Sequence, residues 1–520
     1  MRTKNLKIII ITFLVFSILT TLNCSKSDLN INTNNEKITN LNDKYPKILS
    51  SNATIHPKNS LIAQISGEIE FAGEIYVEYW SNNSERYRSH IEKTNNNNYK
   101  INIYRLTPNT EYNYEVFSLI NGNKGHSFKI GNFLTGELPG SLKDSKLEII
   151  GGTPTFDLIY LEFRQEDFLG LAAYNSKGEI VWYFEADNNE QPYVMSKKEN
   201  GNLVYIAGFE GGTTSTGIVE ITPDGKEVNR LDDICKPYGP IHHEVLALPN
   251  NQIMYLSREI REVELPNKIA KQEGDTIGIW DQNNNKNEIV WTIFDHISPM
   301  ERTPSSNKTL PGNPIWGGCD RDRKVEDWSH GNSIDIGFRG NVIVSLAHLN
   351  QIISISPDFK NIEWRLGGEG SDFEFINTRD KFYHQHTATQ LDNGNILLFD
   401  NGNFRPSDEG GQYSRALELR LDIDNMIATN VWEFPDGPQP VELGIFSPCC
   451  SSVERLKSGN TLVMFGSGLS TYGCCGPFII AEVDNTGLVV WEGLHKSLNK
   501  RNQYRIYSAE SIFNEIKLPN

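Results

Sequence analysis

The chain alternates apolar and polar residues over short runs from about residue 52 to residue 137. In Ile62–Ser66 and Ile75–Trp80, every second side chain would lie on one face of an extended chain, as in a strand with one buried side. Short strand-like runs continue from about Leu147, and this part shows no pattern typical of a long amphipathic helix. The pattern therefore predicts an all-β protein.

Two short motifs recur after Leu147. One is a turn followed by an apolar run, at Asn200–Val204, Asn250–Met254, Gly340–Val344, Asn393–Leu397 and Ser458–Leu462. The other is a short strand that ends in tryptophan, at Trp182, Trp291, Trp364, Trp432 and Trp491. The first gap between these tryptophans is about two units long, and Asp224–Val228 fills it as a degenerate copy. Such repeats predict a six-bladed β-propeller over residues 145–520, because each blade can bury its faces only against its neighbours.

The alternating segment ahead of the propeller predicts a small β-sandwich over residues 52–140. Within it, Leu106–Val116 resembles the strand–turn–strand region of fibronectin type III domains, where a buried Leu and a Tyr flank a turn that contains proline. No residue of this segment indicates chemistry, so we expect a spacer or an interaction module.

The N-terminus has the pattern of an export signal. Arg2, Lys4 and Lys7 precede the apolar run Ile8–Leu22, which is followed at once by Cys24 and polar sequence. We expect residues 1–23 to be a signal peptide. Cys24 resembles the lipidated cysteine of bacterial lipoproteins, which makes residues 24–51 a flexible, lipidated tether. The protein would then be exported and lipid-anchored, in the periplasm or on the cell surface. Asn23 departs from the usual lipoprotein pattern, so ordinary cleavage with an incidental Cys24 is the alternative.

Six further cysteines follow Cys24. They are Cys235, Cys319, and the adjacent pairs Cys449 with Cys450 and Cys474 with Cys475. An even number in an exported chain favours disulfides, whose connectivity the sequence does not give. Two facing cysteine pairs could alternatively bind a soft metal, although zinc ligands are usually spaced by two to four residues.

Charge narrows the choice of partners. The chain has 49 Lys and Arg against 66 Asp and Glu, a net charge of −17. This argues against nucleic acid or an anionic membrane surface as the main partner. An anionic substrate would need a locally positive pocket, which histidines or arginines could supply. A homodimer formed through the sandwich is left open.

Three histidines occupy comparable places in three repeats. His243, His330 and His386 each lie about seven to ten residues before a turn and strand, and inner strands of a propeller converge on one channel. Two chemistries are then open. Three imidazoles and a water could hold a catalytic metal. Alternatively, one neutral imidazole could attack an anion while the others donate hydrogen bonds to it, with no metal.

Several longer motifs bear on this choice. They are His242–Glu244, Asp327–Ser333, Ile362–Gly368, Tyr383–Thr387, Phe399–Gly402, Ser414–Ala416 and Ser458–Leu462. In order and spacing, the chain resembles the bacterial arylsulfotransferases. The resemblance implies an exported six-bladed propeller that moves a sulfuryl group from an aryl sulfate to a phenol. It also implies a sulfated histidine as intermediate and no nucleotide sulfate donor, cofactor or metal.

The resemblance also suggests roles for single residues. The family's nucleophile matches His386, and its supporting histidines match His330 and one of His242 and His243. We prefer His243 because it adjoins Glu244. Asn332 matches an asparagine near the sulfate.

One position departs from the family pattern. Ala347 stands where an arginine is frequent. Arg365 or Arg415 could replace that arginine, or His348 could turn inward, and we include all three among the predicted substrate-binding residues. The missing arginine and the added sandwich favour the alternative of a non-catalytic propeller lipoprotein that binds a ligand or a surface partner. A metal-dependent hydrolase that uses the same histidines is the third interpretation.

Overall fold

The computed structural model describes residues 45–82, 85–120, 122–165, 167–187, 190–208, 215–232, 238–266, 268–301, 325–437, 446–466, 477–496 and 503–519. The predicted signal peptide, Cys24 and most of the predicted tether lie outside these residues, as do Cys235, Cys319, Cys474 and Cys475. Lys44–Asn520 forms one compact unit. In the described part, strands and turns dominate, and the helices are short 3₁₀ turns at Gly140–Asp144, Pro249–Asn251, Ile293–Asp295, Pro299–Glu301, Ala347–Leu349, Thr378–Asp380 and Ser407–Glu409. None of the described helices has the length and apolar character needed to cross a membrane.

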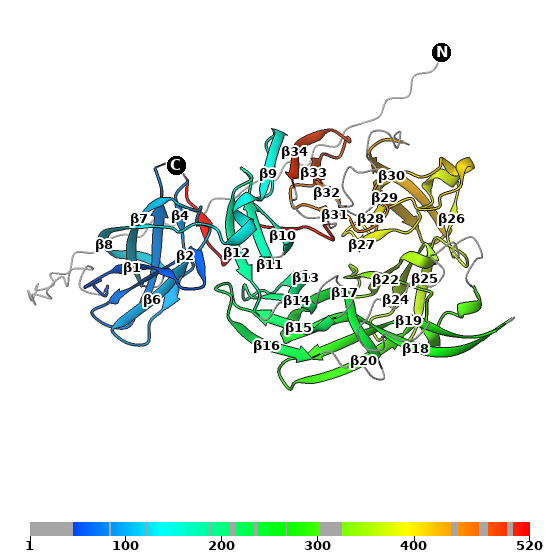
Figure 1. Cartoon of the computed structure of the whole chain (residues 1–520), viewed down its shortest axis with the longest axis horizontal. Coiled ribbons are helices and arrows are strands. Elements are labelled where there is room, and N and C mark those ends of the chain that lie inside the picture. Colours follow the sequence, from blue (N-terminus) through cyan, green and yellow to red (C-terminus); the bar gives the residue numbers. More distant parts are fainter. Residues whose placement is uncertain are drawn as a thin grey trace, which may run out of the picture. The chain divides into compact units, whose positions relative to one another are not determined.

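The N-terminal strands form two sheets (Figure 1). One contains β1 (Asn52–His56), β2 (Asn59–Glu68) and β6 (Asn98–Ile103). The other contains β3 (Glu74–Trp80), β4 (Tyr87–Arg88), β5 (Glu92–Lys93), β7 (Glu111–Ile120), β8 (Asn123–Leu134) and, from the other end of the chain, β36 (Ile516–Lys517). Leu106 and Tyr112, which flank the proline-containing turn, are both buried, and the backbone N–H of Thr107 donates to the Tyr112 hydroxyl at 3.0 Å.

Residues 45–51 were expected at the end of the tether, but they lie against the first sheet. Ile48 is buried and forms a backbone bridge with Ile69, and the N–H of Leu49 donates to the carbonyl of Glu68 at 2.8 Å. The folded part of the chain therefore begins before residue 52.

Strands between residues 146 and 509 form six sheets within the described residues. From the inner strand outward, the first sheet contains β35 (Tyr507–Ala509), β10 (Leu158–Gln165), β11 (Phe168–Asn175) and β12 (Ile180–Glu185), and the second contains β13 (Gln191–Lys197), β14 (Leu203–Gly208), β15 (Ser215–Ile221) and β16 (Glu227–Asp232). The third contains β17 (Tyr238–Leu248), β18 (Gln252–Leu265), β19 (Lys268–Asp281) and β20 (Lys286–Thr292), with β21 (Glu326–Asp327) beside β19, and the fourth contains β22 (Gly331–Ile336), β23 (Val342–Leu346), β24 (Gln351–Ile355) and β25 (Ile362–Leu366). The fifth contains β27 (His386–Gln390), β28 (Ile396–Asp400), β29 (Arg415–Asp422), β30 (Ile427–Phe434) and β26 (Glu374–Phe375), and the sixth contains β31 (Ser452–Arg455), β32 (Thr461–Phe465), β33 (Phe478–Val483), β34 (Val489–Lys496) and β9 (Lys146–Gly152).

Successive sheets contact one another through strands at or next to their inner edges. β10 contacts β13, β13 contacts β17, and the series continues through β22 and β27 to β31. This is the neighbour-to-neighbour packing of a propeller, and the all-β class predicted from the sequence is confirmed (Figure 1). The recurring turns contain Gly201, Gly340, Gly394 and Gly459 at positive φ, between 78° and 91°. Glycine suits these turns because it has no Cβ to clash in that conformation.

Both ends of the repeat region complete sheets of the opposite end. β35 pairs with β10 at the inner edge of the first sheet, and β9 pairs with β34 at the outer edge of the last. The sequence predicted a closing strand at Tyr504–Tyr507. The strand instead begins at Tyr507, and residues 503–506 run past the inner strands. Tyr504 and Arg505 are thereby placed beside the histidines described next.

Candidate functional site

Three inner strands carry the predicted histidines. His243 lies within β17, His330 directly precedes β22, and His386 is the first residue of β27. The ring centres of His243 and His330 are 4.9 Å apart. Tyr504 lies between the rings of His243 and His386, with its ring centre 5.6 Å from that of His243 and 6.1 Å from that of His386. Residues separated by more than 250 positions in the sequence are thus brought to one place.

The backbone is strained where these side chains enter the site. His243, His330 and His384 have φ values of 56°, 51° and 51°, in the left-handed region that L-residues rarely adopt. Thr387, next to His386, has φ of 51°, and the pairing of β27 with β28 shifts register there. Such conformations cost about 1–3 kcal/mol each and cluster at functional sites. We infer that the inner strands bulge to aim these imidazoles.

The tautomer of His386 follows from its neighbour Asn401. Nδ1 of His386 lies 2.7 Å from Oδ1 of Asn401. The amide nitrogen of Asn401 donates to the carbonyls of Ser447 at 2.7 Å and Cys450 at 3.2 Å, so the oxygen faces the imidazole. An amide oxygen only accepts, and Nδ1 must therefore carry the proton. Nε2 then holds the lone pair.

His386 is a neutral imidazole at physiological pH. Burial lowers its pKa to about 3, although the hydrogen bond to Asn401 opposes this. The positive charges of His330 and Arg505 lower that pKa further. Burial likewise lowers the pKa of His384 to about 3 and holds the pKa of His243 well below its usual value. A lone pair on a neutral nitrogen makes His386 chemically suited to nucleophilic attack.

His330 has the opposite electrostatics. Its Nδ1 lies 2.6 Å from Oδ2 of Asp327, a residue that β21 positions. Burial alone would lower the pKa of His330, but the Asp327 carboxylate outweighs it and raises that pKa. The imidazoles of His330 and His348 hold the pKa of Asp327 well below its usual range, against the effect of its burial. The Asp327 carboxylate thus favours the protonated form of His330, whereas burial favours the neutral form of His386.

His348 lies next to His330, as the sequence allowed. The backbone N–H groups of Ala347 and His348 donate to the carbonyls of His330 and Ser329, at 3.0 and 3.2 Å. The rings of His330 and His348 stack with centres 4.4 Å apart, and Nδ1 of His348 lies 2.8 Å from the backbone oxygen of Asp327. Asp327 thus fixes both rings.

Asp327, His330 and His348 form the one cluster in the described residues whose atoms could jointly hold a metal ion. However, the 2.6 Å between His330 Nδ1 and Asp327 Oδ2 is a hydrogen-bond distance. Two ligands about 2 Å from a tetrahedral ion lie more than about 3 Å apart. The observed arrangement therefore suits a shared proton better than a metal.

The structure distinguishes His242 from His243. His242 is buried with Nε2 3.4 Å from Oδ1 of Asp275, whereas His243 faces His330 and Tyr504. Nδ1 atoms of the two imidazoles lie 2.8 Å apart. Glu244, the reason given for preferring His243, instead forms a buried ion pair with Arg505. His243 is the histidine of the pair that faces His330, and its ring contacts, not its neighbour Glu244, distinguish it from His242.

Asn332 braces the loop of the predicted nucleophile. Its side chain is buried, and its Nδ2 donates to the carbonyl of Gln385 at 2.7 Å. Its backbone oxygen accepts from the Tyr504 hydroxyl at 3.1 Å and from Arg505 at 3.0 Å. It joins the His386 loop to the C-terminal segment.

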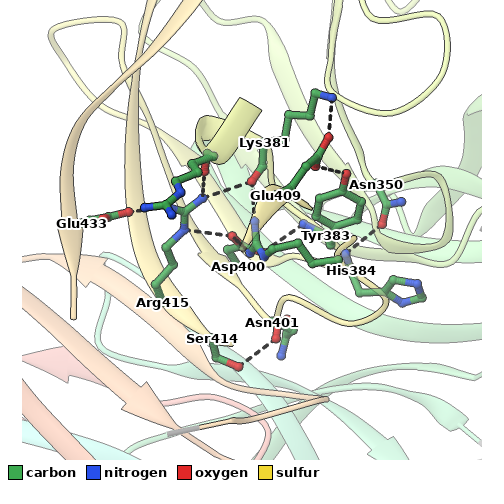
Figure 2. Close-up of polar contacts among 12 residues, drawn as sticks. Asn350, Lys381, Tyr383, His384, Asp400, Asn401, Glu409, Ser414, Arg415 and Glu433 are labelled. Atoms are coloured by element: carbon green, nitrogen blue, oxygen red, sulfur yellow. Dashed lines mark hydrogen bonds and ion pairs between the residues drawn. The ribbon is translucent and has the colours of Figure 1, made fainter. Parts of the chain in front are cut away.

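Neither arginine offered as a replacement for the missing one faces the histidines. Arg415 is 1% exposed, pairs with Asp400 and Glu433, and donates to the carbonyls of Arg379 and Lys381 (Figure 2). Arg365 lies on β25, the outer strand of its sheet, and donates to Gln351 and to the carbonyl of Glu369. The contacts of Arg365 and Arg415 thus indicate a structural role and not substrate binding. Their guanidinium groups are used to hold loops.

Four contributors to the site were missed. Asn401 and Asp327 lie inside motifs that the sequence singled out, and their partners are close along the chain. Arg505 and Tyr504 gave no such signal, because their neighbours Glu244 and Asn332 are 261 and 172 residues away.

Acidification should destabilise the protein through His386. An unfolded histidine titrates near pH 6.5 and the folded one near 3, so the unfolded state alone takes up a proton between these values. Stability therefore falls as the pH falls below about 6.5. We expect His386→Gln to remove about 2 kcal/mol of the loss between pH 7 and pH 5. Urea titrations at both pH values measure this, and an unchanged pH dependence would contradict a neutral buried His386.

The family model for Arylsulfotransferase (ASST) matches residues 152–505, more than half of the chain. Two curated proteins, the arylsulfate sulfotransferases AssT of Lelliottia amnigena and of Escherichia coli, are 25% and 24% identical over 197 residues. Each match covers 30% of this chain and 31% of the relative, so it spans about a third of the relatives' length.

Solved structures give weaker likenesses. A protein of unknown function from Bacteroides caccae has a TM-score of 0.40 and 14% identity, over 71% of this chain and 99% of that one. Virginiamycin B lyase from Staphylococcus aureus has a TM-score of 0.35 and 12% identity, over 68% of this chain and 86% of that one.

Proposed function

Because the chain belongs to the arylsulfotransferase family, we propose that it transfers a sulfuryl group from an aryl sulfate to a phenolic acceptor through a sulfated His386. One observation carries the proposal. His386 is a buried neutral imidazole whose Nδ1 proton is fixed by Asn401, which leaves the Nε2 lone pair for attack. A sulfate ester bears one negative charge, and a neutral nucleophile approaches it with less repulsion than a carboxylate would meet.

In the first step, Nε2 of His386 attacks the sulfur of the aryl sulfate. An N–S bond forms, the bond between sulfur and the aryl oxygen breaks, and its electron pair leaves with the phenolate. Cationic His330, held by Asp327, lies on the same site and would donate to the developing negative charge. His330 gives its proton to the phenolate, which leaves as the phenol, and His330 becomes neutral.

In the second step, an acceptor phenol attacks the same sulfur. The N–S bond breaks, its electrons return to Nε2, and the hydroxyl proton of the acceptor passes to neutral His330, which restores its cationic form. No nucleotide sulfate donor, cofactor or metal enters either step. His243 faces His330 across the site and, being neutral, could accept or donate a hydrogen bond to the acceptor hydroxyl.

Arg505 stands near His386 and could compensate for Ala347. Its side chain is buried, its charge lowers the pKa of His386, and it is held by Glu244 and the carbonyl of Asn332. We therefore replace Arg365 and Arg415 with Arg505 in the proposed site. His348 remains in it because it stacks on His330.

The proposal extends to where the reaction takes place. Residues 1–23 would direct export, and lipidated Cys24 would anchor the chain to a bacterial membrane, with the sandwich of residues 52–140 between the anchor and the propeller of residues 145–520. Incorporation of a labelled fatty acid that is lost in a Cys24→Ser variant would test the anchor.

Mixing the purified protein with 4-nitrophenyl sulfate tests the mechanism. We expect release of nitrophenol, a sulfuryl adduct in the intact-mass spectrum, and peptide mapping of that adduct to His386. Later addition of a phenol should discharge the adduct. Absence of both adduct and nitrophenol with several donors would contradict the proposal and favour a ligand-binding propeller. Nitrophenol release without an adduct, blocked by a chelator, would instead favour a metal-dependent hydrolase.

A further inference from the structure

Asn401 is anchored more firmly than a solvent-facing hydrogen-bond partner would be. It is fully buried, its backbone oxygen accepts from the Ser414 hydroxyl at 2.8 Å, and both carbonyl partners of its amide nitrogen lie in residues 447–450 (Figure 2). Turning the amide over would direct its oxygen at those carbonyls and its N–H at His386. That orientation leaves buried groups unpaired and costs about 1–3 kcal/mol for each. The amide oxygen therefore stays on Nδ1.

We propose that Asn401 keeps a proton on Nδ1 of His386 throughout the reaction, so that the sulfated imidazole stays cationic and passes its sulfuryl group on. This inference rests on the proposed function and adds a positioning residue to it. An amide oxygen is too weak a base to take the proton at neutral pH, whereas a carboxylate at the same place could share or remove it.

The proton decides the leaving group of the second step. With Nδ1 protonated, breaking the N–S bond returns a neutral imidazole, a good leaving group. If Nδ1 had lost its proton, the same bond would have to release an imidazolate anion, which is far more basic. Asn401 therefore makes the intermediate short-lived in the presence of an acceptor.

Two substitutions separate this role from simple support of the fold. Asn401→Asp keeps the acceptor but adds a negative charge, and we expect it to raise the pKa of His386 and to slow discharge of the adduct by about 10- to 100-fold. Asn401→Ala removes the acceptor, so that the proton can move to Nε2. It should slow formation of the adduct by a similar factor without prolonging its life. Burst kinetics with 4-nitrophenyl sulfate, followed by chase with phenol, measure the two half-reactions separately.

An NMR measurement tests the tautomer without relying on activity. With ¹⁵N-labelled histidine, and His386→Gln to assign the signal, the wild-type protein should show His386 protonated at Nδ1 and not titrating between pH 5 and pH 8. In Asn401→Asp the signal should titrate within or near that range. The second carboxylate oxygen of this variant would face the carbonyls of residues 447 and 450, so its circular dichroism must first match that of the wild type.

The outcomes are distinct. Equal slowing of both half-reactions in both variants, or a wild-type His386 protonated at Nε2, would overturn the inference. If the wild type forms no adduct, the proposed function fails and the inference about the sulfated state fails with it. The NMR signal would still show whether Asn401 fixes the proton on Nδ1.

Discussion

Replacing His386 with alanine should lower the rate of phenol release from an aryl sulfate by at least about 10³-fold, because the proposed reaction has no other nucleophile of the same kind. His384 is also neutral, but protein atoms shield its Nε2 completely from solvent, and its ring packs against His348 and Phe404. It is therefore poorly placed to take over. Initial rates with 4-nitrophenyl sulfate and the intact-mass adduct give the two readouts.

The matched control is His90→Ala. His90 lies in the N-terminal part between β4 and β5, and its pKa is also lowered to about 4 by burial. Its removal deletes a half-buried imidazole that packs on Phe513 and lies 3.4 Å from Glu92, away from the site histidines. We expect this variant to retain nearly full activity. Loss of activity in both variants would indicate a general structural effect and would argue against His386 as the nucleophile.

Arg415→Met should destabilise the protein by about 3–5 kcal/mol, the cost expected when one partner of a buried ion-pair network is removed. Asp400 would keep Arg405, but Glu433 and the carbonyls of Arg379 and Lys381 would lose their donor (Figure 2). Urea unfolding of the purified variant gives the change in the free energy of unfolding.

Arg365→Met is its control, because both arginines were predicted from the sequence to bind substrate. Arg365 is half-buried on an outer strand, and we expect a loss of about 1 kcal/mol or less. If either variant folds normally but raises the KM for an aryl sulfate without affecting stability, that arginine binds substrate after all.

Part of the site could be predicted from the sequence because the propeller repeats a local pattern. Each turn and strand sets a register, and His243, His330 and His386 fall at comparable distances from it, so their convergence needs only the repeat and the fold. Asp327 lies three residues before His330. Asn401 lies one residue after the strand that pairs with His386. Both are near the motifs that the sequence singled out.

The arginines could not be assigned in this way. Several arginines are compatible with a place near the sulfate, and the sequence does not show which carboxylates each one meets. Arg415 is held by Asp400 on the neighbouring strand, whereas Arg505 reaches Glu244 across 261 residues. The segment that carries Arg505 also closes the first sheet through β35.

The sequence by itself determined the all-β class, the alternating strands, and the three histidines, because side-chain period and turn residues act over a few positions. Only the tertiary structure decided which histidine of the pair at 242 and 243 faces the others, which arginine stands near His386, and which nitrogen of His386 carries the proton. Each of these depends on hydrogen bonds and charges between segments far apart in the chain. The free energy of such contacts is fixed by burial and geometry, which no local pattern encodes.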